Sequence, residues 1–472
     1  AHELATAGLT VVVLEEGGQA NGTHRPGTLD DGLFGVYRDN GLTNTFGTPL
    51  ISLPMGRAVG GTTVINSGTC FRTPEWILHS WSRLGLDRIS PDDMAPIFDD
   101  VEDVIGVAPV PDETLGAIGA VFRRGAAALG FARGRIRRNA RHCHGHGRCA
   151  FGCPIDAKQG MAVSYLPRAV AAGARVFAHC RVDRIEMQSG RAAGVHAVAH
   201  DPLTDSPRSE LRVRARAVVL AAGAIFTPAL LARQHLAGTS GQLGRNLVVH
   251  PGAGTTALFD EALHAWRGVM QSYFVDAKLR DGILLEATFP PPGIGYSAGS
   301  LPGIGLEMKR YFARFPQMAA CGSIISDAGS GRVTPPRRGA VIRYSLAPDD
   351  VRKVVEGIAA ACEIYLAAGA TEVYPMLPGY TAVRTRGDVE RLRSARIRRS
   401  DLKLSAYHPM GTARMGTDPA SSVVDAWGRV HDADGLWILD ASVMPSSTAV
   451  NPQITIMALA ARGARRLADQ LT

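Results

Sequence analysis

The C-terminal stretch from residue 405 to residue 461 constrains the fold more than any other part of the sequence. It begins SAYHPMGTARMG and ends GLWILDASVMPSSTAVNPQITIMALAA. The short apolar run 436–439, which ends at Asp440, predicts a buried strand. Pro452 begins an alanine-rich segment that predicts a buried helix, because its apolar residues share one face: Ile454, Met457, Ala458 and Ala461. Asn451 is placed to cap this helix, whose N-terminus would stabilise a nearby anion.

Two residues of this stretch carry side chains suited to chemistry, His408 and Asn451. A histidine titrates near neutral pH, so His408 is a candidate general base. Taken one at a time, each residue also has a purely structural interpretation. His408 would then brace a turn, and Asn451 would only cap a helix.

Taken together, HPMGT, DASVMP and NPQITIMALA resemble the C-terminal signature of the glucose–methanol–choline (GMC) flavin oxidoreductases. In that family a His and a second His or Asn face the reactive edge of FAD, which implies His408 and Asn451 as the catalytic pair. An Asn at the second position is similar to the sterol-oxidising branch. The resemblance covers nearly the whole chain, with the motifs in the expected order.

The resemblance implies an α/β fold with a discontinuous, Rossmann-like FAD-binding domain. We assign residues 1–75, 155–251 and 405–472 to that domain. Residues 76–154 would form a connecting segment with a cysteine-rich loop. Residues 252–404 would form an inserted α+β substrate domain built on an antiparallel sheet.

The first 18 residues, AHELATAGLTVVVLEEGG, look like the second half of a dinucleotide-binding βαβ unit. A β-branched run at 10–14 predicts a strand, and Glu15 closes it. An acidic residue at that point binds ribose hydroxyls, about 20 residues after a glycine-rich turn. The strand and G-x-G-x-x-G turn that precede it in the family are absent from the 472 residues. We therefore expect an incomplete copy of a longer protein, short by about 15 to 25 residues, that binds FAD weakly.

Further cofactor contacts are expected where small residues let the backbone approach a ligand. The string PMGRAVGGTTVINSGT at 54–69 resembles the family's second glycine motif. The resemblance also places the backbone of one strand residue, Val182, against adenine. The complete set of predicted cofactor-binding residues is Glu15, Gly60, Gly61, Asn66, Val182, Ala222, Gly223, Asp440, Ala441 and Pro452.

In the predicted substrate domain, Glu286 in the string ILLEA is a candidate for a second acid–base group. Apolar residues of this region are candidates for pocket lining, although such residues more often belong to a core. They are Tyr273, Phe274, Phe289, Met308, Tyr311, Phe312 and Phe315.

The connecting segment contains three cysteines, Cys143, Cys149 and Cys153, in the spacing C-x5-C-x3-C followed by Pro154. This spacing matches neither a bacterial ferredoxin nor a paired structural zinc site. Structural thiols or a disulfide are favoured, a metal or cluster stays open, and no metal ligand is assigned. A similar segment occurs in the long-chain fatty alcohol oxidase branch of the family.

Composition limits the possible partners. The chain has 472 residues, a net charge of +8 and scattered basic residues, without a motif for nucleic acid. Its longest apolar run, 217–232, is shorter than a membrane span of about 20 residues and is interrupted by Gly223 and Pro228. It predicts a strand, a turn and a helix. No signal peptide is visible, so a cytoplasmic location is expected, with an upstream targeting signal left open.

The function implied by the resemblance is FAD-dependent oxidation of an alcohol, lipophilic and either long-chain or sterol-like, to a carbonyl. Hydride would pass to flavin N5 while His408 takes the hydroxyl proton and Asn451 holds the oxygen. The electron acceptor stays open among oxygen, a quinone and a cytochrome. The alternatives are a metal–sulfur electron-transfer protein centred on Cys143–Cys153 and an inactive relic of the family.

Overall fold

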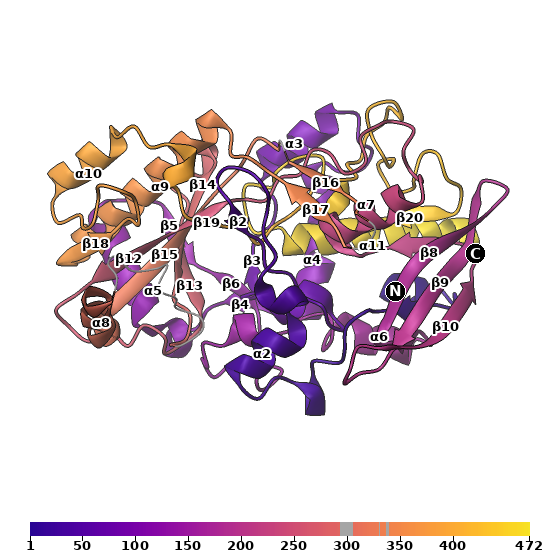
Figure 1. Cartoon of the computed structure of the whole chain (residues 1–472), viewed down its shortest axis with the longest axis horizontal. Helices are drawn as coiled ribbons and strands as arrows, with labels where there is room; N and C mark the ends of the chain where they lie inside the picture. The colour runs from indigo at the N-terminus through magenta and orange to yellow at the C-terminus, as the bar shows by residue number, and fades with distance from the viewer. Residues whose placement is uncertain (293–304, 330, 337–338) are drawn as a thin grey trace.

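Two lobes lie side by side in the computed structural model, which describes residues 1–292, 305–329, 331–336 and 339–472. We call them the sheet lobe, on the left of Figure 1, and the terminal lobe, on the right, which holds both ends of the chain. Segments from the first third of the chain lie between them.

The sheet lobe is built on one eight-stranded sheet with the order β2-β19-β12-β15-β14-β13-β5, in which β18 also pairs with β12. Apart from the parallel pair β2 and β19, neighbouring strands are antiparallel. This confirms the predicted antiparallel sheet, although strands from outside 252–404 also join it. The strands are β2 (Ile51–Ser52), β5 (Arg133–Arg135), β12 (Gly252–Leu258), β13 (Gln271–Val275), β14 (Ile283–Thr288), β15 (Met318–Ile325), β18 (Glu372–Tyr374) and β19 (Leu404–Ser405).

Helices α5 (Asp112–Ala128) and α9 (Pro348–Ala367) pack beside this sheet. Pro348 opens α9 with its fixed φ, and two aspartates in the first turn favour the helix dipole. The buried face of α9 belongs to the large hydrophobic core that also takes in β12, β14 and β15. Two shorter helices, α8 (Leu306–Ala313) and α10 (Arg386–Arg393), complete this lobe.

The terminal lobe contains two parallel strand pairs, β1 (Val12–Leu14) with β7 (Arg175–Phe177) and β11 (Val218–Leu220) with β20 (Leu436–Ile438). The predicted division of 217–232 is confirmed, because β11 turns directly into α7 (Gly223–Arg233). The remaining elements here are α1 (His2–Thr6), α6 (Tyr165–Ala171), α11 (Gln453–Leu471) and the antiparallel sheet β8 (Cys180–Gln188), β9 (Arg191–His200) and β10 (Pro207–Arg214).

Connecting elements complete the described chain. They include a small antiparallel sheet in which β6 lies between β3 and β4. None of the helices in the described ranges is both long enough and apolar enough to cross a membrane. The connecting elements are α2 (Leu29–Val36), α3 (Glu75–Arg83), α4 (Pro91–Ile105), β3 (Thr69–Cys70), β4 (Val107–Pro109), β6 (Arg137–Asn139), β16 (Arg332–Thr334) and β17 (Val341–Arg343).

Candidate active site

One continuous cavity of about 2580 Å³ extends along the terminal lobe and reaches the large sheet. It is larger than the ~300–1,000 Å³ of an ordinary small-molecule pocket, so it has room for a dinucleotide together with a second molecule. Every predicted site residue lines it: Glu15, Gly60, Gly61, Asn66, Val182, Ala222, Gly223, His408, Asp440, Ala441, Asn451 and Pro452.

At one end of the cavity, Glu15 follows β1 directly. Its carboxylate accepts a hydrogen bond from the backbone N–H of Gly17 at 2.8 Å, and burial raises its pKa. The neighbouring Glu16 pairs with Arg38 at 2.8 Å and Arg57 at 3.2 Å. Glu15 differs from Glu16 in this respect. Among the described residues, no cationic side chain lies within ion-pair distance of the Glu15 carboxylate.

The glycine turn before residue 61 has the backbone conformation that the sequence predicts. Gly60 has φ +101° and Gly61 has φ +57°, values that favour glycine. A Cβ at Gly61 would meet no heavy atom within 4 Å, so this position faces open space. The hydroxyl of Thr63 donates to the carbonyl of Gly60 at 2.5 Å and fixes the turn.

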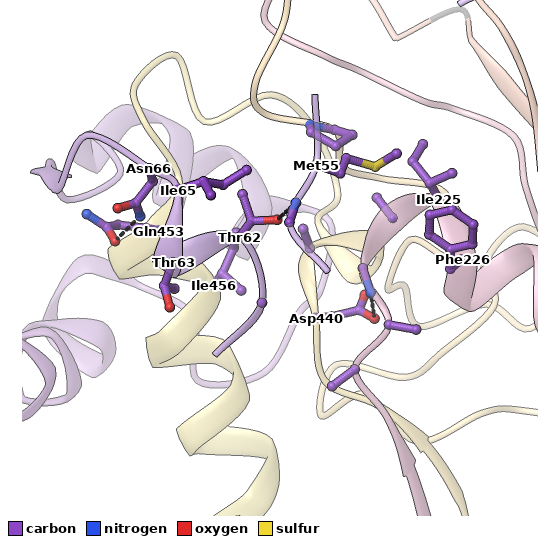
Figure 2. Close-up of a pocket in the computed structure, with 18 of the residues that line it drawn as sticks. Met55, Thr62, Thr63, Ile65, Asn66, Ile225, Phe226, Asp440, Gln453 and Ile456 are labelled. Carbon is purple, nitrogen blue, oxygen red and sulfur yellow. Dashed lines mark hydrogen bonds between the residues drawn. The ribbon is translucent and has the colours of Figure 1, made fainter. Parts of the chain in front are cut away.

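Asn66 connects this segment to the start of α11, as Figure 2 shows. Its Nδ2 donates to Oε1 of Gln453 at 2.9 Å, and its Oδ1 accepts from the N–H of Gly68 at 3.1 Å. Gln453 in turn donates to the carbonyl of Thr69 at 2.6 Å. The side chain of Asn66 thus positions the loop, although the residue lines the cavity.

Asp440 acts as an internal brace in the same way. Its carboxylate, labelled in Figure 2, accepts from the N–H of Gly223 at 2.9 Å and from Thr227 Oγ1 at 2.6 Å. It also accepts from the N–H and hydroxyl of Ser442 at 2.8 and 2.6 Å. Burial raises the pKa of Asp440 against the lowering effect of these four donors. One carboxylate therefore ties the β20 end to the turn before α7.

At the other end of the cavity, Asn451 meets Glu286 on β14. The predicted capping role of Asn451 is wrong, because the residue that precedes α11 is Pro452, and it makes no side-chain cap. The Asn451 side chain instead places Nδ2 3.5 Å from Oε2 of Glu286. Burial raises the pKa of Glu286 to about 7, which the contact with Asn451 partly offsets.

His408 lies beside a second histidine, His250, with the ring centroids 5.4 Å apart and the rings edge to face. Burial lowers the pKa of His408 to about 4 and that of His250 well below its usual range. His250 was not among the predicted site residues. Its Nε2 contacts Ser447 Oγ at 2.6 Å, and Asp327 accepts from its backbone N–H at 3.0 Å.

Several buried atoms in this region make no hydrogen bond, among them Nδ1 of His408, Oδ1 of Asn451 and Oε1 of Glu286. Buried polar atoms without partners are uncommon and cost free energy. All three residues line the cavity, so a polar ligand there would supply the missing bonds. Because the glycine turn, the small residues and the start of α11 share this cavity, the residues present fit a flavin dinucleotide.

The wall formed by the large sheet carries small residues, and the seven candidates for pocket lining are not part of it; the sequence had favoured a place in the core for such residues. Tyr273, Phe274, Phe289, Met308, Tyr311, Phe312 and Phe315 do not line the cavity. Phe289 packs on Phe315 and Tyr311 on Tyr374. The sheet instead presents Gly252, Gly254, Ala320 and Gly322. Apolar composition alone did not separate core from lining positions.

The three clustered cysteines are not disulfide-bonded. Within the described ranges, no three His, Cys, Asp or Glu side chains are gathered closely enough to hold a metal ion. Cys149 contacts Arg138 Nη2 at 2.9 Å. These thiols lie behind the 64–69 loop, a placement the sequence did not predict.

Comparison with known proteins identifies the family. Models of the GMC oxidoreductase family match residues 33–252 and 330–460. An uncharacterized GMC-type oxidoreductase of Mycobacterium tuberculosis is 44% identical over 468 residues, covering 98% of this chain and 72% of the relative. The long-chain-alcohol oxidase FAO1 of Arabidopsis thaliana is 27% identical over 507 residues, covering 99% of this chain and 64% of the relative.

The fold has counterparts among solved structures. A pyridoxine 4-oxidase from Mesorbium loti matches with a TM-score of 0.70 and 19% identity, covering 98% of this chain and 96% of that one. An Aspergillus oryzae formate oxidase matches with a TM-score of 0.69 and 15% identity, covering 100% and 96%. The fold and the site therefore define a flavin-dependent oxidoreductase.

The chain belongs to the GMC oxidoreductase family, as the sequence predicted. Members of this family bind FAD, which confirms the predicted cofactor.

The bracing role of Asp440 generates a first test. All four groups around the Asp440 carboxylate are hydrogen-bond donors. In an Asp440→Asn variant the side-chain NH₂ replaces one carboxylate oxygen, so it faces N–H or O–H donors and a buried hydrogen bond is lost. We expect a stability loss of about 1–3 kcal/mol in urea unfolding and a lower flavin content after purification. The exposed Asp434→Asn change, which removes only a surface pair with Arg429, is the control. Full flavin content and unchanged unfolding in Asp440→Asn would show that the brace is dispensable.

Proposed function

We propose that this protein oxidises the CH–OH group of a lipophilic alcohol, long-chain or sterol-like, to a carbonyl. The observation that carries the proposal is that His408, Asn451 and Glu286 line one cavity, that each has a buried atom without a hydrogen bond, and that Asn451 and Glu286 are in contact. A hydroxyl group both donates and accepts hydrogen bonds, so it complements these atoms. Family membership and the long-chain-alcohol oxidase relative support the same substrate class.

FAD, when bound, supplies the hydride acceptor for this reaction. The residues that would hold it are the cavity-lining set from Glu15 to Pro452 described above. The first N–H groups of α11 have no acceptor within the helix, so they favour negative charge close to Pro452.

His408 is suited to take the hydroxyl proton because it is neutral at working pH. Its pKa of about 4 leaves a free ring nitrogen for the substrate, although this value is lower than the near-neutral pKa that the sequence predicted and makes His408 a weaker base than a free imidazole. Edge-on packing against His250 holds the ring in place, and Ser447 fixes His250 in turn. Asn451 does not titrate, so its part is to hold the hydroxyl oxygen at a fixed place next to His408.

Glu286 is a second proton acceptor in this proposal. A general base is most effective when its pKa lies near the operating pH, and the pKa of Glu286 is about 7. Its contact with Asn451 places it beside the group that holds the substrate oxygen. We assign Glu286 the role of a second acid–base group beside the substrate oxygen.

The cavity wall supports a lipophilic substrate. Small residues of β12 and β15 leave room along the sheet, so a bulky apolar body fits beside it. Among the cavity-lining residues contributed by the large sheet, Glu286 is the one with an ionisable carboxylate.

Removal of His408 tests the proton-transfer role. His408→Ala should keep flavin absorbance and stability but lower the rate of flavin reduction by alcohol about 10²–10⁴-fold, the usual contribution of a positioned base. Anaerobic stopped-flow absorbance measures this rate. His431→Ala serves as the matched control, since His431 contacts Ser422 elsewhere in the terminal lobe. Reduction at the normal rate in His408→Ala would remove this residue from the mechanism.

The raised pKa of Glu286 predicts a pH dependence. If the ionised carboxylate is required, kcat/KM should rise as pH increases through about 7, and Glu286→Gln should lose that rise. Because the folded-state pKa is raised, the stabilisation associated with the protonated form is lost as pH increases through about 7. Glu286→Gln should therefore gain thermal stability relative to the wild type at pH 8 but not at pH 4. An identical pH profile in both proteins would exclude Glu286 as the acceptor.

A further inference from the structure

Two buried cations lie behind the loop that carries Asn66. Arg138, 3% exposed on β6, donates to the carbonyl of Ser67 from Nη2 at 2.6 Å and from Nε at 3.1 Å. Lys158, 5% exposed, donates from Nζ to the carbonyls of Val64 at 2.7 Å and Asn66 at 2.6 Å. The two side chains thus hold the four residues 64–67 from the side away from the cavity.

Neither cation has an ordinary counter-ion. In the part of the chain that the structure describes, no carboxylate lies within ion-pair distance of Arg138 or Lys158. Two unpaired buried cations would be costly. The titratable groups that face them are thiols: Cys143 and Cys149 beside Arg138, and Cys149 and Cys153 beside Lys158.

Among the three thiol residues, Cys149 makes hydrogen bonds to both cations. Its Sγ accepts from Arg138 Nη2 at 2.9 Å and from the backbone N–H of Met270, while its carbonyl accepts from Lys158 at 2.8 Å. Burial raises the pKa of the Cys149 thiol, but the charges of Arg138 and Lys158 and the hydrogen bonds more than offset this and lower it. A short contact with a guanidinium is typical of a charged acceptor.

We propose that Cys149 is a positioning residue, held as a thiolate, that serves as the counter-ion of Arg138 and Lys158 and so fixes the flavin-binding loop. The thiolate keeps both cations charged, and the charged side chains hold the carbonyls of Val64, Asn66 and Ser67. The bond from Met270 adds a link to β13, whose Gln271 accepts from Thr69 Oγ1 at 2.6 Å. The proposal requires only that the chain bind FAD and is independent of the alcohol activity.

The charge on Cys149 should change the pH at which Lys158 loses its proton, and this change can be measured. Burial lowers its pKa to about 8, while Cys149 and Cys153 raise it. Without the thiolate, Lys158 loses its proton at a lower pH, and the loop is held less firmly. In the wild type, FAD affinity should therefore fall as pH rises through about 8. When the Cys149 charge is removed, the affinity should fall at a lower pH.

The first measurement is direct. The ultraviolet thiolate absorbance of the FAD-bound wild type, minus that of Cys149→Ser, should show one thiolate at neutral pH that disappears on acidification. If Cys149→Ser does not fold, Cys149→Asp replaces it as the reference. A thiolate that forms only near the ordinary pKa of cysteine, about 8.5, would overturn the proposal.

The second measurement titrates FAD into each variant across pH. In Cys149→Ser, the pH at which FAD affinity is lost should be lower by about one unit, as expected when one nearby opposite charge is removed. Cys149→Asp, which restores the charge, should restore the wild-type profile. Cys362→Ala, a buried thiol in α9 of the sheet lobe, is the control and should not move it. Equal weakening of Cys149→Ser and Cys149→Asp at every pH, or no change in either, would contradict a charge role.

Discussion

Burial of ionisable side chains at the meeting of the two lobes is the constraint on which the rest of the site depends. The same low-dielectric surroundings lower the pKa of His408 and raise that of Glu286, so both tend toward the neutral form. Glu286 comes from β14 in the sheet lobe, whereas Asn451 precedes α11 in the terminal lobe. The burial behind both pKa shifts arises where the lobes meet.

The fold also supplies groups that brace the cavity wall. Asp440 collects four donors and ties β20 to the turn before α7. Arg138 and Lys158 hold the loop that carries Asn66. In each case a buried charge is balanced by N–H groups, carbonyls or an opposite charge, so the backbone that faces the cofactor is fixed without side-chain contact to it.

Local patterns in the sequence predicted the elements, and tertiary contacts decided the roles. The apolar run before Asp440 and the alanine-rich segment after Pro452 are confirmed as β20 and α11, because periodicity and burial act within one element. The cap assigned to Asn451 is wrong, since its partner Glu286 lies 165 positions away in the chain. The thiol surroundings of Lys158 were not predicted either: Cys149 is nine positions away in the chain, but its contacts with Lys158 and Arg138 depend on how this loop folds.

The central claim is that this cavity oxidises lipophilic alcohols at the carbinol carbon. The most direct measurement mixes the flavin-loaded protein, without oxygen, with a long-chain primary alcohol or a sterol, in parallel with the same compound carrying deuterium at that carbon. We expect the visible flavin absorbance to bleach, the carbonyl product to form in equal amount, and the deuterated compound to react more slowly. An absorbance that stays unchanged with every alcohol tried, in protein that holds stoichiometric FAD, would contradict the account.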